Sequence, residues 1–218
     1  MRSFFRNNGL SITFFILFLV SIAGQTFTGY RQYNKELKEK HVAVIPFARY
    51  LSSGHFIQAT FENWESEFLQ MGMFVFLSIF LFQKGSSESK KFDGTDEVDK
   101  EPSPRKKNAP WPVKKGGVIL KIYKHSLTIA LVLLWLISFI LHFYGSLKDE
   151  NTQNRLKGEP AVSTKDYIGS SRFWFESFQN WQSEFLSVFS LVLLSVYLRQ
   201  KGSSQSKPVD ASYDETGE

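Results

Sequence analysis

A duplicated stretch of nine residues most constrains how this chain can fold. Residues 61–69 read Phe-Glu-Asn-Trp-Glu-Ser-Glu-Phe-Leu, and residues 178–186 read Phe-Gln-Asn-Trp-Gln-Ser-Glu-Phe-Leu. The offset of 117 positions aligns residues 8–91 with residues 125–208 without a gap. Self-similarity at a fixed offset is the sequence signature of a repeated structural unit. The sequence therefore predicts one unit that occurs twice.

Apolar residues gather in blocks rather than being spread along the 218 residues, of which 22 are Phe. A block of about 20 apolar residues is long enough to cross a bilayer as a helix. Residues 10–27 and 126–144 have this character, and we predict them as the first and third membrane spans. A signal peptide is the alternative for the first block, because residues 21–23 (Ser-Ile-Ala) resemble a cleavage site. The recurrence of this block inside the chain favours a span.

The second and fourth spans are harder to place. The uncharged runs 68–82 and 185–198 reach only about 22 Å as helices, whereas the hydrocarbon core is about 30 Å thick. Each helix must therefore begin near Trp64 or Trp181. The predicted fold class is an all-α membrane protein with four transmembrane helices, arranged as two parallel two-span repeats.

Both repeats end in Gln-Lys-Gly-Ser-Ser-x-Ser-Lys, at residues 83–90 and 200–207. This stretch lacks Walker spacing, so we interpret it as a helix end and linker rather than a phosphate loop. Gly85 and Gly202 suit left-handed C-caps. The lysines can snorkel, and the tryptophans belong to an aromatic belt at the membrane surface. The predicted interface anchors are Trp64, Trp181, Lys84 and Lys201.

The predicted organisation is a first two-span repeat (1–91), a disordered cytoplasmic linker (92–117), a second two-span repeat (118–208) and a disordered tail (209–218). The linker and the tail are polar and cannot bury an apolar face. In the second repeat, Ser163 and Asp166 have capping-box spacing, which predicts a short helix ending near Ile168. Lys and Arg residues cluster at the span ends that carry the termini and the linker, so the positive-inside rule places these in the cytoplasm.

Comparison of the two repeats points to one pair of acids. Glu67 and Glu184 are the only acidic residues at matching positions. At helical spacing they join a polar stripe, and one hypothesis is that the two carboxylates form a proton or cation site. The other is that they lie in the wet interface, where Asn and Glu hydrogen bonds fix helix packing; this interpretation is favoured because the apolar runs are short. The candidate ion or packing site comprises Asn63, Glu67, Gln70, Asn180 and Glu184.

Several kinds of chemistry find no support in the sequence. The chain has no Cys, and none of its four His residues is retained in both repeats, so no metal and no cofactor are predicted. No nucleophile elbow, dinucleotide fingerprint or His-Glu-x-x-His motif occurs. The formal net charge of +5 is concentrated beside the apolar blocks, which argues for membrane orientation and against nucleic acid as a partner. We therefore expect no enzyme.

The paired Phe-x-Asn-Trp-x-Ser-Glu-Phe-Leu motifs, the two Gln-Lys-Gly-Ser-Ser-x-Ser-Lys ends and the Pro-Trp-Pro-Val linker resemble a family of uncharacterised bacterial integral membrane proteins, a domain of unknown function. The resemblance implies a bacterial membrane protein and no known reaction. The first expectation for function is a non-enzymatic envelope protein acting through partner or lipid contacts. A small proton- or cation-coupled channel or transporter using Glu67 and Glu184 comes second, and an envelope-lipid enzyme last. The expected partners are the bilayer and a second copy of the chain, and the expected location is the bacterial inner membrane.

Overall fold

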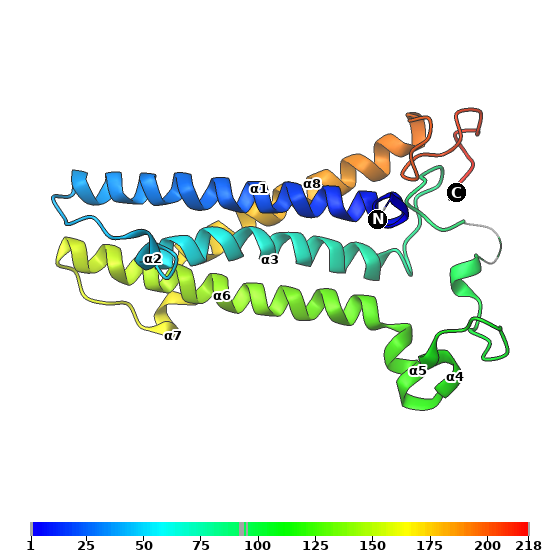
Figure 1. The fold of residues 1–218 in the computed structure, drawn as a ribbon, viewed down its shortest axis with the longest axis horizontal. Coiled ribbons are helices and arrows are strands. Elements are labelled where there is room, and N and C mark those ends of the chain that lie inside the picture. The colour runs from blue at the N-terminus through cyan, green and yellow to red at the C-terminus, as the bar shows by residue number, and fades with distance from the viewer. Residues whose placement is uncertain (1, 92–93, 95, 218) are drawn as a thin grey trace. The chain divides into compact units, whose positions relative to one another are not determined.

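The computed structural model describes residues 2–91, 94 and 96–217. Within these residues the chain forms eight α-helices, one short 3-10 helix and no β-strand (Figure 1). The all-α part of the prediction is therefore confirmed. The helices are α1 (Arg2–Glu39), α2 (Phe47–Tyr50), α3 (Gly54–Leu77), the 3-10 helix η1 (Glu97–Asp99), α4 (Trp111–Lys115), α5 (Gly117–Lys124), α6 (Ser126–Lys157), α7 (Thr164–Tyr167) and α8 (Ser171–Tyr197).

The chain divides into two compact units. Unit 1 comprises Met1–Phe61 and Ile140–Phe173, and unit 2 comprises Glu62–Phe139 and Trp174–Glu218. The boundaries fall inside α3, α6 and α8, so each unit takes residues from both sequence repeats. The predicted division into two repeats, a linker and a tail concerns the sequence and stays a prediction.

Two of the described helices, α1 and α6, are long and apolar enough to cross a membrane. No residue in the most apolar 18-residue stretch of α1 is buried within the protein, and only 17% of the residues in that of α6 are buried. A helix that is apolar all round and not covered by its own protein needs lipid or a partner around it. These helices contain the predicted first and third spans.

The other two predicted spans are not supported by the same properties. Helices α3 and α8 are long enough, with 24 and 27 residues. The first half of each, however, carries charged and amide side chains, which lower its average apolar character. Among the described residues, two helices are therefore long and apolar enough to span a membrane. Helix length and apolarity do not support four spans.

Local signals in the sequence give mixed results. The capping serine is confirmed, because Ser163 Oγ accepts a hydrogen bond from Asp166 N (3.2 Å) and α7 ends beside Ile168. Gly85 and Gly202 have positive φ values of 87° and 84°, as predicted. Their placement as helix caps is wrong, since α3 and α8 end before them, at Leu77 and Tyr197. Both glycines instead form turns in the segments that follow the helices.

Pairs of residues 117 positions apart make the same local hydrogen bonds. In unit 1, the Asn34 side chain bonds both polar backbone atoms of Ile45, and Asn151 does the same to Val162. In unit 2, Ser89 Oγ accepts from Gln83 N (3.0 Å) and Ser206 Oγ accepts from Gln200 N (2.9 Å). The asparagines close the loops that follow α1 and α6, and the serines close the two Gln-Lys-Gly-Ser-Ser-x-Ser-Lys loops.

Candidate functional site

The predicted polar stripe lies on α3 and α8 within unit 2. On α3, Asn63 and Glu67 are exposed and Gln70 is half-buried. On α8, Asn180 and Glu184 are half-buried. The carboxylates of Glu184 and Glu67 interact electrostatically. The structure therefore brings the two predicted carboxylates into electrostatic range. Their assignment as a site stays a prediction.

Among the described residues of unit 2, the carboxylate of Glu65 is completely buried. Trp181 Nε1 on α8 donates a hydrogen bond to Glu65 Oε1 on α3 at 3.0 Å. A buried carboxylate is stable only when hydrogen bonds replace the water it has lost, so this indole N–H has a structural role. Trp181 therefore connects two helices, and its role as an interface anchor stays a prediction.

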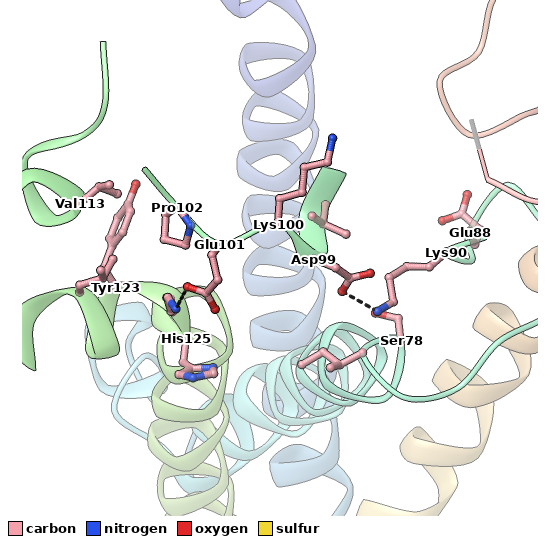
Figure 2. A pocket seen from close by; sticks show the side chains of 14 residues that line it. Ser78, Glu88, Lys90, Asp99, Lys100, Glu101, Pro102, Val113, Tyr123 and His125 are labelled. Atoms are coloured by element: carbon pink, nitrogen blue, oxygen red, sulfur yellow. Dashed lines mark hydrogen bonds and ion pairs between the residues drawn. The ribbon is translucent and has the colours of Figure 1, made fainter. Parts of the chain in front are cut away.

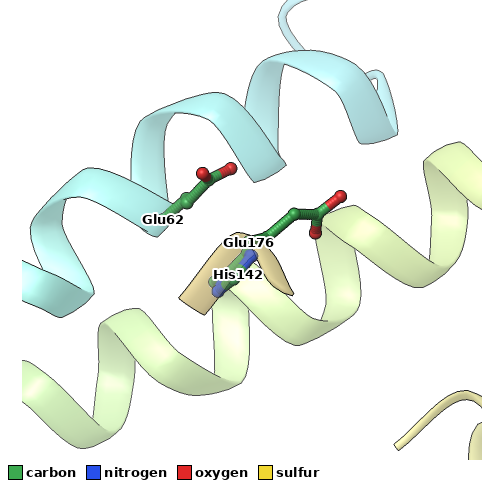
Figure 3. A group of neighbouring side chains, drawn as sticks. All are labelled: Glu62, His142 and Glu176. Carbon is green, nitrogen blue, oxygen red and sulfur yellow. The ribbon is translucent and has the colours of Figure 1, made fainter. Parts of the chain in front are cut away.

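A second contact between α3 and α8 in unit 2 involves two more acids. Asn180 Nδ2 donates to Glu62 Oε1 and also to the backbone oxygen of Glu176 (2.9 Å). The carboxylates of Glu62 and Glu176 have oxygens within 4.8 Å of each other (Figure 3). Like charges at this separation raise each other's energy unless a proton, a cation or donor groups lie nearby. Asn180 supplies one such donor.

These three acids do not stand out from the symmetry of the two repeats. Glu62 and Glu65 align with Gln179 and Gln182, and Glu176 aligns with Ala59, so none of the three has an acidic counterpart in the other repeat. A usable signal was present, since Glu62 and Glu65 are three residues apart and share one face of a helix. The repeat cannot show which face another helix covers.

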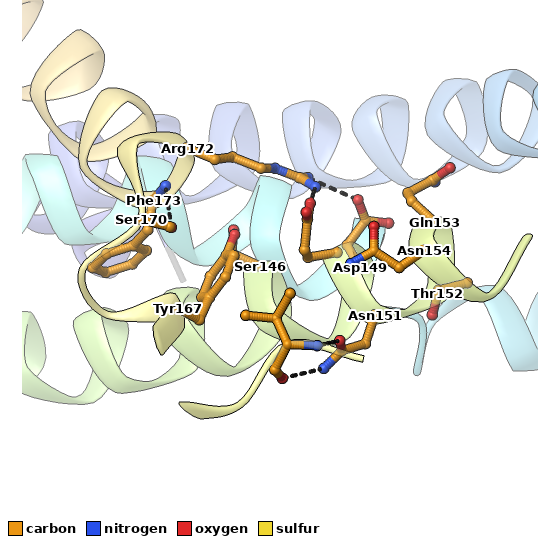
Figure 4. A network of polar contacts seen from close by, with 12 residues as sticks. Ser146, Asp149, Asn151, Thr152, Gln153, Asn154, Tyr167, Ser170, Arg172 and Phe173 are labelled. Atoms are coloured by element: carbon orange, nitrogen blue, oxygen red, sulfur yellow. Dashed lines mark hydrogen bonds and ion pairs between the residues drawn. The ribbon is translucent and has the colours of Figure 1, made fainter. Parts of the chain in front are cut away.

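A network of polar contacts in unit 1 centres on Arg172, near the start of α8 (Figure 4). Its guanidinium donates to Asp149 Oδ2 (2.8 Å) and to Glu150 Oε2, both on α6, and to Gln58 Oε1 (3.3 Å) on α3. The Asp149 side chain is almost fully buried, and its Oδ1 has no hydrogen-bond partner among the described residues. One arginine thus connects three helices. The sequence did not indicate this network, because its members are up to 114 positions apart.

Two buried tyrosines occupy matching positions in unit 1 and differ in their hydroxyl partners. Tyr50 lies close to Gly29, where an added Cβ would be 2.3 Å from the hydroxyl oxygen, and bonds His55 Nδ1 at 3.4 Å. Tyr167 instead bonds Ser146 Oγ at 2.5 Å, and Ser146 aligns with Gly29 in the repeat. Burial raises the pKa of Tyr50 to about 12, with smaller contributions from Tyr33 and Glu36. Tyr50 therefore stays protonated throughout the physiological range.

The remaining predicted anchors lie in unit 2. Trp64 is half-buried, and Lys201 is exposed. Lys84 pairs with Asp214 of the C-terminal segment at 3.2 Å. The lysine that this unit buries is Lys207, whose ammonium donates to the backbone oxygens of Ser212 (2.9 Å), Tyr213 (3.3 Å) and Glu215 (2.7 Å).

A cavity of about 720 Å³ in unit 2 lies between the end of α3, the linker and α5 (Figure 2). Its charged lining residues are largely paired. Lys90 bonds Asp99 (2.9 Å), and Lys124 bonds Glu101 (2.6 Å). The apolar part of the lining comes from Val113, Leu120 and Tyr123, among others. Paired charges suit packing of the linker better than capture of a charged ligand.

Comparison with known proteins adds a family match and no activity. The model of a family described as Domain of unknown function (DUF6766) matches residues 1–218. No curated protein and no solved structure matches the chain.

Proposed function

The chain belongs to this family of unknown function, and from that premise we propose that it is an integral membrane protein with a non-enzymatic, structural or partner- and lipid-binding role in the cell envelope. The observation that carries the proposal is the exposed apolar surface of α1 and α6. Soluble proteins rarely leave such an extended apolar surface in water. A bilayer covers it without any further partner.

The finer proposal is a four-span, multi-pass protein of the bacterial cytoplasmic membrane, with both termini and the linker in the cytoplasm. Helices α3 and α8 would be the additional spans, with their polar first halves facing each other rather than lipid. The contact of Trp181 with Glu65 supports this arrangement, because polar side chains in spans satisfy one another across helices. A homodimer is the protein partner that the proposal includes.

Cysteine labelling tests this topology, because the natural chain contains no Cys. Single substitutions Ala43→Cys, Val98→Cys, Ala161→Cys and Val209→Cys are introduced into the full chain in intact cells. We expect residues 43 and 161 to react with a membrane-impermeant maleimide from outside, and residues 98 and 209 only after permeabilisation. Resistance to alkaline carbonate extraction provides the control for membrane insertion.

Three results would contradict parts of the proposal. Release by carbonate would exclude an integral membrane protein. Labelling of residues 43 and 98 from the same side would remove α3 as a span. A mature N-terminus near Gly24 would make the first apolar block a signal peptide instead of a span.

The second candidate function is a proton- or cation-coupled channel or transporter. The sequence predicts Glu67 and Glu184 for this role, whereas the buried Glu65 and the close pair Glu62 and Glu176 favour a different set of acids. Intramembrane ionisable residues commonly mark ion or proton pathways. An enzyme acting on envelope lipids ranks last among the proposals.

Flux into proteoliposomes under a pH or cation gradient separates these possibilities. If the close pair Glu62 and Glu176 carries ions, Glu62→Gln/Glu176→Gln should reduce flux by at least about tenfold, while Glu67→Gln/Glu184→Gln retains it. Loss of flux in Glu67→Gln/Glu184→Gln, with flux retained in Glu62→Gln/Glu176→Gln, would favour Glu67 and Glu184 as the ion site. Absence of flux in the folded wild-type protein would eliminate the transport function and leave the partner- and lipid-binding role.

A further inference from the structure

The segment from Trp111 to Lys124 folds into two short helices with a sharp turn between them. Helices α4 and α5 are joined at Gly116 and Gly117, whose φ values are 71° and 59°. Residues other than glycine rarely adopt such φ values. The two helices pack against each other. We call this segment the α4–α5 element.

The α4–α5 element has a covered side and an uncovered apolar side. Val113 is buried, and Leu120 and Tyr123 line the cavity shown in Figure 2. Val118 and Ile122 are 70% and 56% exposed, although both are fully apolar side chains. They are four positions apart on α5 and therefore share one face. This face is apolar and has no cover from the described part of the chain.

The charge of the α4–α5 element has a single sign. Residues 111–124 contain four lysines and no acidic residue. Lys124 forms an ion pair with Glu101, and Lys114 donates to the backbone oxygen of Lys107. Lys115 and Lys121 are exposed. Exposed apolar side chains interspersed with lysines are typical of helices that lie in a membrane interface.

The position of the element in the chain identifies the surface that it meets. Helix α6, which is apolar enough to span a bilayer, begins at Ser126, two residues after α5 ends. If α6 spans, α5 lies next to the membrane surface. Trp111 is also exposed, and tryptophan prefers the headgroup level of a bilayer. Basic segments next to a span bind anionic lipids electrostatically.

We propose that the α4–α5 element docks on an anionic lipid surface, with Val118 and Ile122 in the headgroup region and Lys114, Lys115 and Lys121 on the lipid phosphates. The proposal rests on the proposed membrane location of the chain. It assigns lipid binding to the α4–α5 element. Docking also holds the linker against the membrane at the entrance to α6.

The test measures how fast a single cysteine reacts with a maleimide in full-length protein in nanodiscs. Val118→Cys reports on the docked face, and Val98→Cys, at a side chain that is 79% exposed in η1, is the matched control. We expect Val118→Cys to react at least about fivefold more slowly in phosphatidylglycerol-containing nanodiscs than in pure phosphatidylcholine, since one lysine near an anionic surface contributes about that factor. The maleimide reaction of Val98→Cys should not be slower in phosphatidylglycerol-containing nanodiscs than in pure phosphatidylcholine.

A charge variant separates electrostatic docking from simple burial. In a Val118→Cys background, Lys114→Gln/Lys115→Gln/Lys121→Gln should restore fast labelling in anionic nanodiscs, and so should high salt. Equal rates for Val118→Cys in both lipids would overturn the proposal. Protection by added RNA in phosphatidylcholine, without any effect of anionic lipid, would also overturn it in favour of a nucleic-acid surface. Failure of the protein to insert into nanodiscs would instead contradict the proposed membrane location.

Discussion

Gly145→Ala is expected to destabilise unit 1 by about 3 kcal/mol or more, the upper end of the usual cost of overpacking. A Cβ at position 145 of α6 would lie 2.4 Å from the backbone nitrogen of Gln58 and 2.9 Å from the carbonyl carbon of Ile57, both in α3. These are backbone atoms inside a helix and cannot move aside individually. The helices would have to separate, which removes packing around the whole contact.

The measurement is thermal unfolding of the detergent-solubilised protein, followed by circular dichroism. Gly24→Ala is the matched control, because Gly24 also lies inside a long helix but has no atom within 4 Å of an added Cβ. Alanine favours a helix over glycine by roughly 0.5–1 kcal/mol, so this variant should unfold at the same or a slightly higher temperature. Equal unfolding temperatures for the two variants would contradict the close approach of α3 and α6 in unit 1.

Arg172→Met is expected to cost about 2–3 kcal/mol of folding free energy. Removing one partner of a buried ion pair costs about 3–5 kcal/mol, because the other charge stays buried without compensation. Here the Arg172 side chain is 35% exposed, which reduces the penalty, whereas Asp149 is nearly fully buried. Asp149 would then lose the hydrogen bond to Oδ2 (Figure 4), while its Oδ1 already has no partner in the described part of the chain.

A rescue variant identifies the cause. Adding Asp149→Asn to Arg172→Met removes the uncompensated charge and should recover more than half of the lost stability in chemical unfolding. Arg49→Met, which removes an exposed arginine from α2 in the same unit, should change stability by less than about 0.5 kcal/mol. If Arg49→Met and Arg172→Met were equally destabilising, the polar network would have no special role.

The role of symmetry explains why part of the site could not be predicted. The repeat identified Glu67 and Glu184 because they match, yet among the described residues the fully buried acid is Glu65, whose counterpart is Gln182. Equivalent positions in two copies share a backbone conformation but need not share neighbours. A carboxylate is buried where another helix supplies a donor, as Trp181 does for Glu65.

The sequence by itself determined the features that depend on short stretches of chain. The apolar blocks of α1 and α6, the serine that caps α7 and the positive φ values of Gly85 and Gly202 follow from local composition and local steric limits. Each of these depends on residues only a few positions apart. Sequence periodicity and turn chemistry therefore report them directly.

Only the tertiary structure decided which polar groups meet. The ion pair of Arg172 with Asp149, the hydrogen bond from Trp181 to Glu65 and the close approach at Gly145 join residues 23, 116 and 87 positions apart. The physical reason is that burial and pairing depend on which helix faces lie against each other. A periodic pattern predicts that a helix has an apolar and a polar face, but it does not identify which helix covers either face.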